Sequence, residues 1–145
     1  MTPYFDTSFI APLILEEPSS SKTEAFLAKL PPADLYISHG TCVEFASLVA
    51  REVRMGGLPE PDAFQALSQF DELVAESFQL LVPGPLDYEL AKGYLRHFAT
   101  QLRAGDALHL AVARNQGAKM LYTLGEGLLH AATLLKVQAS RGIPT

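Results

Sequence analysis

The segment Tyr4-Phe5-Asp6-Thr7-Ser8-Phe9-Ile10 opens the chain as an apolar run that is interrupted by one carboxylate. An unpaired charge inside a buried strand would either become neutral or draw the strand toward water. We therefore expect a buried strand that ends at Asp6, with this carboxylate facing a cleft. The hydroxyls of Thr7 and Ser8 follow directly and could orient it.

Length and composition indicate one globular domain over residues 1–145, with 48% hydrophobic and 19% charged residues. The net charge of -5 excludes a generally basic nucleic-acid coat, so any contact with nucleic acid must be local or pass through metal ions. A single cysteine, Cys42, excludes an internal disulfide and a cysteine metal cluster, and suits a cytoplasmic protein. No apolar run reaches the length of a membrane span, so we expect no membrane contact.

Apolar, strand-like segments alternate with helix-like segments along the chain. Beyond the first strand, the pattern predicts strands at 35–38, 79–82, 119–123 and, as a short last strand, 137–139. A turn at 39–41 is expected before a helix from Cys42 to about Met55, which two glycines close. Alternating strands and helices predict an α/β fold with a parallel sheet covered on both faces.

Acidic residues stand near the ends of several expected strands. Asp6 ends the first strand, Glu44 lies in the first turn of the helix after the second, and Glu126 follows the fourth. Asp106 opens the helix that precedes the fourth strand. Ligands of open α/β sheets bind outside the carboxyl ends of the strands, so these acids could meet at one edge.

Clustered carboxylates repel one another unless a cation neutralises them. Oxygen ligands without cysteine suit a hard cation such as Mg²⁺ or Mn²⁺. Such an ion can activate a water and stabilise the leaving oxygen of a phosphodiester. Thr7, Ser8 and Thr123 are candidates for orienting the carboxylates by hydrogen bonds.

Four segments together resemble PIN-domain ribonucleases, specifically the VapC-type toxins of toxin–antitoxin pairs. They occur in the family's order and span nearly the whole chain: FDTSFI (5–10), SHGTCVEF (38–45), LRAGDALHLAVA (102–113) and KMLYTLGEGL (119–128). The resemblance implies a three-layer α/β sandwich whose short, mainly parallel sheet of four to five strands is flanked by about seven helices. It also implies that Asp6, Glu44 and Asp106 are the catalytic, metal-binding acids.

The activity implied by the resemblance is a metal-dependent endoribonuclease that hydrolyses RNA phosphodiester bonds. The implied partners are an RNA substrate, a small antitoxin whose C-terminal tail enters the cleft, and a second copy of the chain. Arg103, three residues before Asp106, and Arg51 are candidate phosphate contacts.

One position departs from the family pattern of threonine, any residue, aspartate. Here Thr123 and Leu124 are followed by Gly125, and Glu126 is the candidate replacement, so the number of metal ions stays open. With that acid lost, the alternative is a PIN-like module that binds RNA or a partner protein without cleavage. An aspartyl-phosphate phosphotransferase fits less well, since its pattern has a second aspartate where this chain has Ser8.

His109 follows Asp106 by one helical turn. Two interpretations are open: a packed, hydrogen-bonded histidine, which we favour, or a side chain that reaches the cleft.

Overall fold

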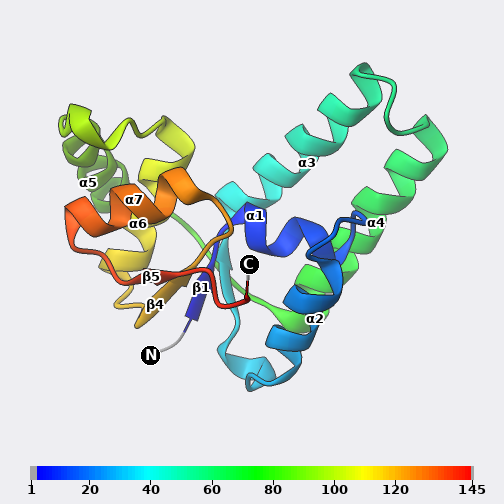
Figure 1. Ribbon diagram of the computed structural model, residues 1–145, viewed down its shortest axis with the longest axis horizontal. Helices are drawn as coiled ribbons and strands as arrows, with labels where there is room; N and C mark the ends of the chain where they lie inside the picture. Colours follow the sequence, from blue (N-terminus) through cyan, green and yellow to red (C-terminus); the bar gives the residue numbers. More distant parts are fainter. Residues whose placement is uncertain (1–2, 145) are drawn as a thin grey trace.

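The computed structural model describes residues 3–144, and within them five parallel strands form the central layer (Figure 1). The strands are β1 (Pro3–Phe5), β2 (Tyr36–Ser38), β3 (Gln79–Leu81), β4 (Met120–Tyr122) and β5 (Ala139–Ser140). Their order is β3-β2-β1-β4-β5, and each neighbouring pair is parallel. The short parallel sheet predicted from the sequence is confirmed.

Helices cover both faces of this sheet. In the described part of the chain they are α1 (Thr7–Ile10), α2 (Ser20–Ala28), α3 (His39–Arg54), α4 (Glu60–Ser77), α5 (Pro85–Leu95), α6 (Ala104–Asn115) and α7 (Glu126–Leu135). Helices α1 to α4 lie on one side and α5 to α7 on the other, which gives the expected three layers (Figure 1). None of these helices is long and apolar enough to cross a membrane.

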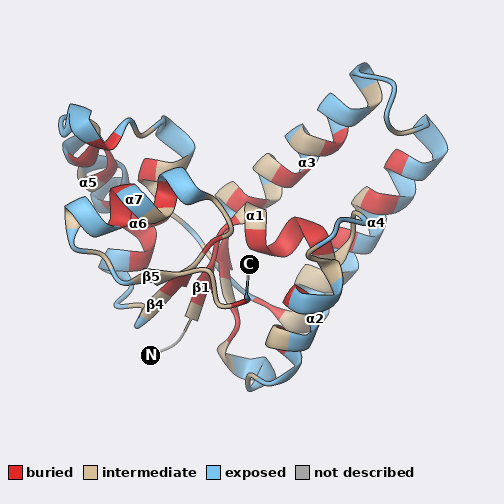
Figure 2. Ribbon diagram, viewed as in Figure 1, coloured by how far each residue is buried: buried red, intermediate tan, exposed pale blue. Residues whose placement is uncertain are grey.

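The alternation of side chains along β1 divides the interior into two cores. Tyr4 packs with Leu110 and Leu121 beneath α5 to α7, whereas Phe5 packs with Phe9 and other residues beneath α1 to α4. Successive side chains of a strand point to opposite faces, and both faces of this sheet are covered. Figure 2 shows the resulting buried layer through the middle of the molecule.

Helices α3 and α4 run side by side as an arm that extends away from the sheet (Figure 1). The rings of Phe45 and Phe70 stack across this helix pair, with centroids 4.1 Å apart and planes at 7°. Both side chains are buried, so the pair anchors the base of the arm in the core.

Two expected boundaries were wrong. The predicted turn at 39–41 is the first turn of α3, because Ser38 keeps an extended backbone and the helix begins directly after it. The last strand lies at Ala139–Ser140 instead of 137–139. Val137 is unavailable to the sheet, since its N–H donates to the Ala132 carbonyl and closes α7.

Candidate active site

Asp6 lies where β1 leaves the sheet, as predicted, and its carboxylate caps α1. One oxygen, Oδ1, accepts hydrogen bonds from the Ser8 hydroxyl at 2.7 Å and the Phe9 N–H at 3.2 Å. The other, Oδ2, accepts from the Thr123 hydroxyl at 2.6 Å. Three donors therefore hold a carboxylate that is only 5% exposed.

This position coincides with the point where the strand order reverses. The chain places β2 and β3 on one side of β1 and then crosses to β4 on the other side. Asp6 follows β1 and Thr123 follows β4, so their hydrogen bond bridges the two strands at this point. Ligand sites of open α/β sheets form at such a reversal.

Glu44 reaches the same edge from α3. Because α3 begins at His39, Glu44 lies in the second turn and not, as predicted, in the first. Its Oε1 accepts hydrogen bonds from the Thr7 hydroxyl at 2.6 Å and contacts His109 Nε2 at 2.5 Å. Its Oε2 faces Gly105, where an added Cβ would lie 2.5 Å from that oxygen. A side chain at position 105 would therefore push this oxygen of Glu44 aside.

The charges of these acids act on one another. Burial raises the pKa of the Asp6 carboxyl. Burial also raises the pKa of Asp106, and the negative charges of Asp6 and Glu44 add to that rise. For Glu44, burial alone would raise the pKa, but the hydrogen bond and charge of His109 outweigh it and lower the pKa. The structure therefore brings Asp6, Glu44 and Asp106 into one electrostatic cluster.

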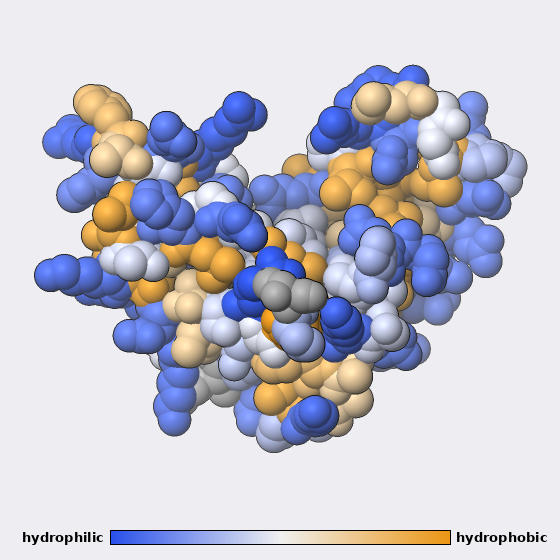
Figure 3. Space-filling view, viewed as in Figure 1, coloured by the Kyte–Doolittle hydropathy of each residue, from blue (hydrophilic) through white to orange (hydrophobic). Residues whose placement is uncertain are grey.

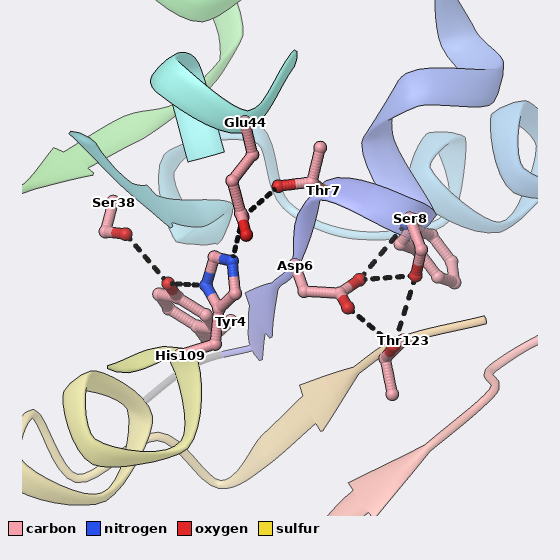
Figure 4. Close-up of polar contacts among 9 residues, drawn as sticks. Tyr4, Asp6, Thr7, Ser8, Ser38, Glu44, His109 and Thr123 are labelled. Carbon is pink, nitrogen blue, oxygen red and sulfur yellow. Dashed lines mark hydrogen bonds and ion pairs between the residues drawn. The ribbon is translucent and has the colours of Figure 1, made fainter. Parts of the chain in front are cut away.

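These side chains do not form a complete set of metal ligands in the described structure. Among residues 3–144, no three His, Cys, Asp or Glu side chains stand together as metal ligands. Figure 4 shows that hydrogen bonds from Ser8 and Thr123 engage both oxygens of Asp6, whereas the contact with His109 engages only Oε1 of Glu44. The donor set nevertheless fits a hard divalent cation, because it consists of carboxylate oxygens whose mutual repulsion a cation would relieve. These residues thus fit Mg²⁺ or Mn²⁺ in chemistry.

A model of the PIN domain matches residues 4–134, which is most of the chain. The chain belongs to the PIN domain family. This match confirms the family resemblance and the fold that it implied. Among curated proteins, none matches the sequence.

Several solved structures share this PIN fold. The sarcin-ricin loop cleaving toxin VapC20 of Mycobacterium tuberculosis is 22% identical, with a TM-score of 0.71 over 90% of this chain and 95% of that chain. FitAcB from Neisseria gonorrhoeae is 21% identical, with a TM-score of 0.69 over 97% and 98%. VapBC-1 from nontypeable Haemophilus influenzae is 18% identical, with a TM-score of 0.66 over 98% of both chains. At these identities the likeness concerns the fold.

The departure at Gly125 has a clear structural counterpart in this PIN domain. The Gly125 N–H donates to the Thr123 hydroxyl at 3.0 Å, and that hydroxyl in turn donates to Asp6. Glu126 opens α7 with an exposed side chain, and no hydrogen bond or ion pair ties it to the residues described. The structure therefore does not bring Glu126 to the three acids, and its role as a metal ligand stays a prediction.

The two predicted RNA contacts differ in how near they lie in sequence to the acids. Arg103 is three residues from Asp106, and Arg51 is seven residues from Glu44. Arg103 is exposed and immediately precedes α6, so it flanks the turn that carries Asp106. Arg51 is exposed two turns along α3 from Glu44 and lines a groove with Leu15 and Glu52. Arg103 is thus the better placed of the two candidates.

His109 and Tyr4 belong to the polar network, although the sequence analysis did not include them in the site. His109 is only 3% exposed and hydrogen-bonded, as favoured, but it also contacts Glu44. Tyr4, from the apolar run of β1, pairs its hydroxyl with His109 Nδ1 at 2.6 Å. The available signal was the spacing, because residues three apart on a helix share a face with Asp106.

Asp106→Asn should stabilise the metal-free protein near neutral pH. A carboxyl whose folded pKa is raised binds more protons when folded, so its ionisation reduces stability as pH rises above about 4. The variant removes that cost, and its advantage in urea unfolding with EDTA should grow from about pH 4 to neutrality. Millimolar Mn²⁺ should then raise the melting temperature of the wild type by mass action and that of the variant far less. If the gain in unfolding free energy of Asp106→Asn over the wild type were the same at about pH 4 and at neutral pH, the raised pKa of Asp106 would be contradicted.

Proposed function

We propose that this PIN domain is a metal-dependent endoribonuclease and the toxin of a VapC-type toxin–antitoxin pair. The observation that carries the proposal is the cluster of Asp6, Glu44 and Asp106, which come from three separate elements to one sheet edge. The family match supports it, as does the shared fold with a toxin that cleaves the sarcin-ricin loop.

Asp6, Glu44 and Asp106 would hold Mg²⁺ or Mn²⁺. When bound, the ion would supply activation of water and neutralisation of charge on the scissile phosphate. The chain's own contribution is orientation. Ser8 and Thr123 fix the carboxylate of Asp6, and such supporting hydrogen bonds commonly decide ligand geometry and affinity.

The exposed Arg103 offers a cation for the RNA backbone next to this edge. Phosphate contacts by arginine supply sequence-independent affinity that falls with salt. With a net charge of -5, the protein depends on such a local cation and on bound metal to attract RNA.

A small antitoxin is the protein partner that we propose. The inner side of the α3–α4 arm carries apolar surface (Figure 3), and a groove of about 510 Å³ lies there. Leu48, Met55 and Leu58 supply apolar walls. The charged lining is mainly acidic, with Glu16, Glu17 and Glu52 beside Arg51. Burial and the charge of Glu52 raise the pKa of Glu17, so a basic group in the partner would relieve this repulsion. An apolar and basic antitoxin segment matches the groove.

We also propose a homodimer in the cytoplasm. Exposed apolar side chains gather after the edge strand β3 and at the start of α5, namely Val82, Leu86 and Tyr88. Exposed apolar groups near an unpaired sheet edge favour association with another chain.

The test is cleavage of RNA by purified, antitoxin-free protein with Mn²⁺ or Mg²⁺. We expect cleavage to give products with 5′-phosphate and 3′-hydroxyl ends and to stop with EDTA. Glu126→Gln, assayed in parallel, will show whether this residue replaces the acid that Gly125 lacks. Folded protein that binds RNA but cuts none with either metal would reject the nuclease and favour the non-cutting module.

A further inference from the structure

A buried chain of hydrogen bonds runs from β2 to the site. The Tyr4 hydroxyl donates to Ser38 Oγ at 2.9 Å and pairs with His109 Nδ1 at 2.6 Å. His109 Nε2 then contacts Glu44 Oε1 at 2.5 Å (Figure 4). Ser38, Tyr4 and His109 are each 3% exposed or less, and they come from three elements, β2, β1 and α6. A network that is buried and fully paired is rigid.

The chain fixes the orientation of the His109 ring. Each ring nitrogen has its own partner, Tyr4 at Nδ1 and Glu44 at Nε2, so the ring cannot turn without leaving a buried polar group unpaired. The tilted contact between the rings of Tyr4 and His109, with centroids 5.7 Å apart, further limits its movement.

Glu44 is held on one oxygen and free on the other. Oε1 accepts a hydrogen bond from the Thr7 hydroxyl and contacts Nε2 of His109. Oε2 accepts no hydrogen bond from residues 3–144 and points at the first turn of α6, where Gly105 makes room for it. The oxygen without a hydrogen bond is therefore the one that lies against Gly105, the residue before Asp106.

We propose that His109 is a positioning residue that holds Glu44 so that its Oε2 is presented to a divalent cation shared with Asp106. This role rests on the proposed metal-dependent function. His109 touches neither RNA nor the ion in this account; it acts through Glu44, and Tyr4 acts through His109.

The test is Mn²⁺ binding, measured by the electron paramagnetic resonance signal of free Mn²⁺, with cleavage assayed in parallel. His109→Leu introduces an apolar side chain of similar bulk that can make neither hydrogen bond. It should weaken Mn²⁺ binding about 10- to 100-fold. His109→Gln retains an amide N–H that can donate to Glu44, and should stay within a few-fold of the wild type. The matched control is His130→Leu on the exposed face of α7, which should change nothing.

A residue that only fills the core gives a different pattern. In that case the Leu and Gln variants would lose thermal stability while keeping the wild-type affinity for Mn²⁺, and the positioning role would be rejected. If His109→Leu does not fold, Tyr4→Phe decides: a several-fold loss of Mn²⁺ affinity supports the role and unchanged affinity rejects it. If the wild type binds Mn²⁺ and cuts RNA and the His109 variants do so equally well, only the positioning role is rejected. A wild type that does neither rejects the proposed function as well.

Discussion

Asp6→Asn should lower metal-dependent RNA cleavage by about a thousandfold or more. Metal ions supply several kcal/mol of transition-state stabilisation in such sites, and each 1.36 kcal/mol is about tenfold in rate. Asparagine keeps the size of the side chain and an oxygen that can still accept from Ser8 or Thr123. The variant therefore removes the charge that would ligate the ion while leaving the local fold in place.

The matched control is Asp62→Asn, the same substitution at an exposed carboxylate in the first turn of α4. It should cleave RNA at the wild-type rate, measured as initial rates on one labelled RNA at saturating Mn²⁺. Circular dichroism would verify that both variants are folded. A folded Asp6→Asn protein that retains more than about a tenth of the activity would contradict the assignment of Asp6 as a ligand.

Phe45→Ala should cost about 3–5 kcal/mol of unfolding free energy. Phe45 is fully buried and stacks on Phe70 at the base of the α3–α4 arm. Truncation removes both the buried apolar surface and the stacking contact, and the rigid neighbours cannot close the cavity completely. Because α3 also carries Glu44, we expect the weakened arm to reduce metal-induced stabilisation too.

Urea unfolding of the metal-free protein measures this cost. Phe64→Ala provides the control, because Phe64 lies on the same helix α4 but is 66% exposed. It should change the unfolding free energy by no more than about 0.5 kcal/mol. A loss under about 1 kcal/mol for Phe45→Ala would mean that the arm is not anchored through this ring pair.

The sequence predicted those features that local pattern controls. The run before Asp6 is apolar and ends in an acid, so both the buried strand and the carboxylate at its end could be inferred. Glu44 and Asp106 could be placed because strands alternating with helices predict a parallel sheet with a common carboxyl edge.

The features that the sequence did not predict depend on tertiary contacts. Glu44 and His109 are 65 residues apart, and their contact depends on how α3 and α6 pack across the sheet edge. The position of the last strand likewise follows from its register, in which the Thr123 N–H pairs with the Ser140 carbonyl. No local pattern in the sequence encodes either contact.

The structure also refines the departure from the family pattern. Glu126 has the charge of the missing acid, but helix α7 begins at this residue and leaves its side chain exposed. The Thr123 hydroxyl instead connects the Gly125 loop to Asp6. Glu126→Gln is therefore expected to affect cleavage far less than Asp6→Asn.

The most direct test of the central claim, that Asp6, Glu44 and Asp106 form one metal site, is a crystal structure of the protein grown with millimolar Mn²⁺ and examined by anomalous scattering. The account predicts an anomalous peak on the order of 2 Å from carboxylate oxygens of Asp6 and Asp106, with Glu44 Oε2 turned toward it. A peak bound elsewhere, or three acids that keep their present hydrogen bonds without any peak between them, would contradict it.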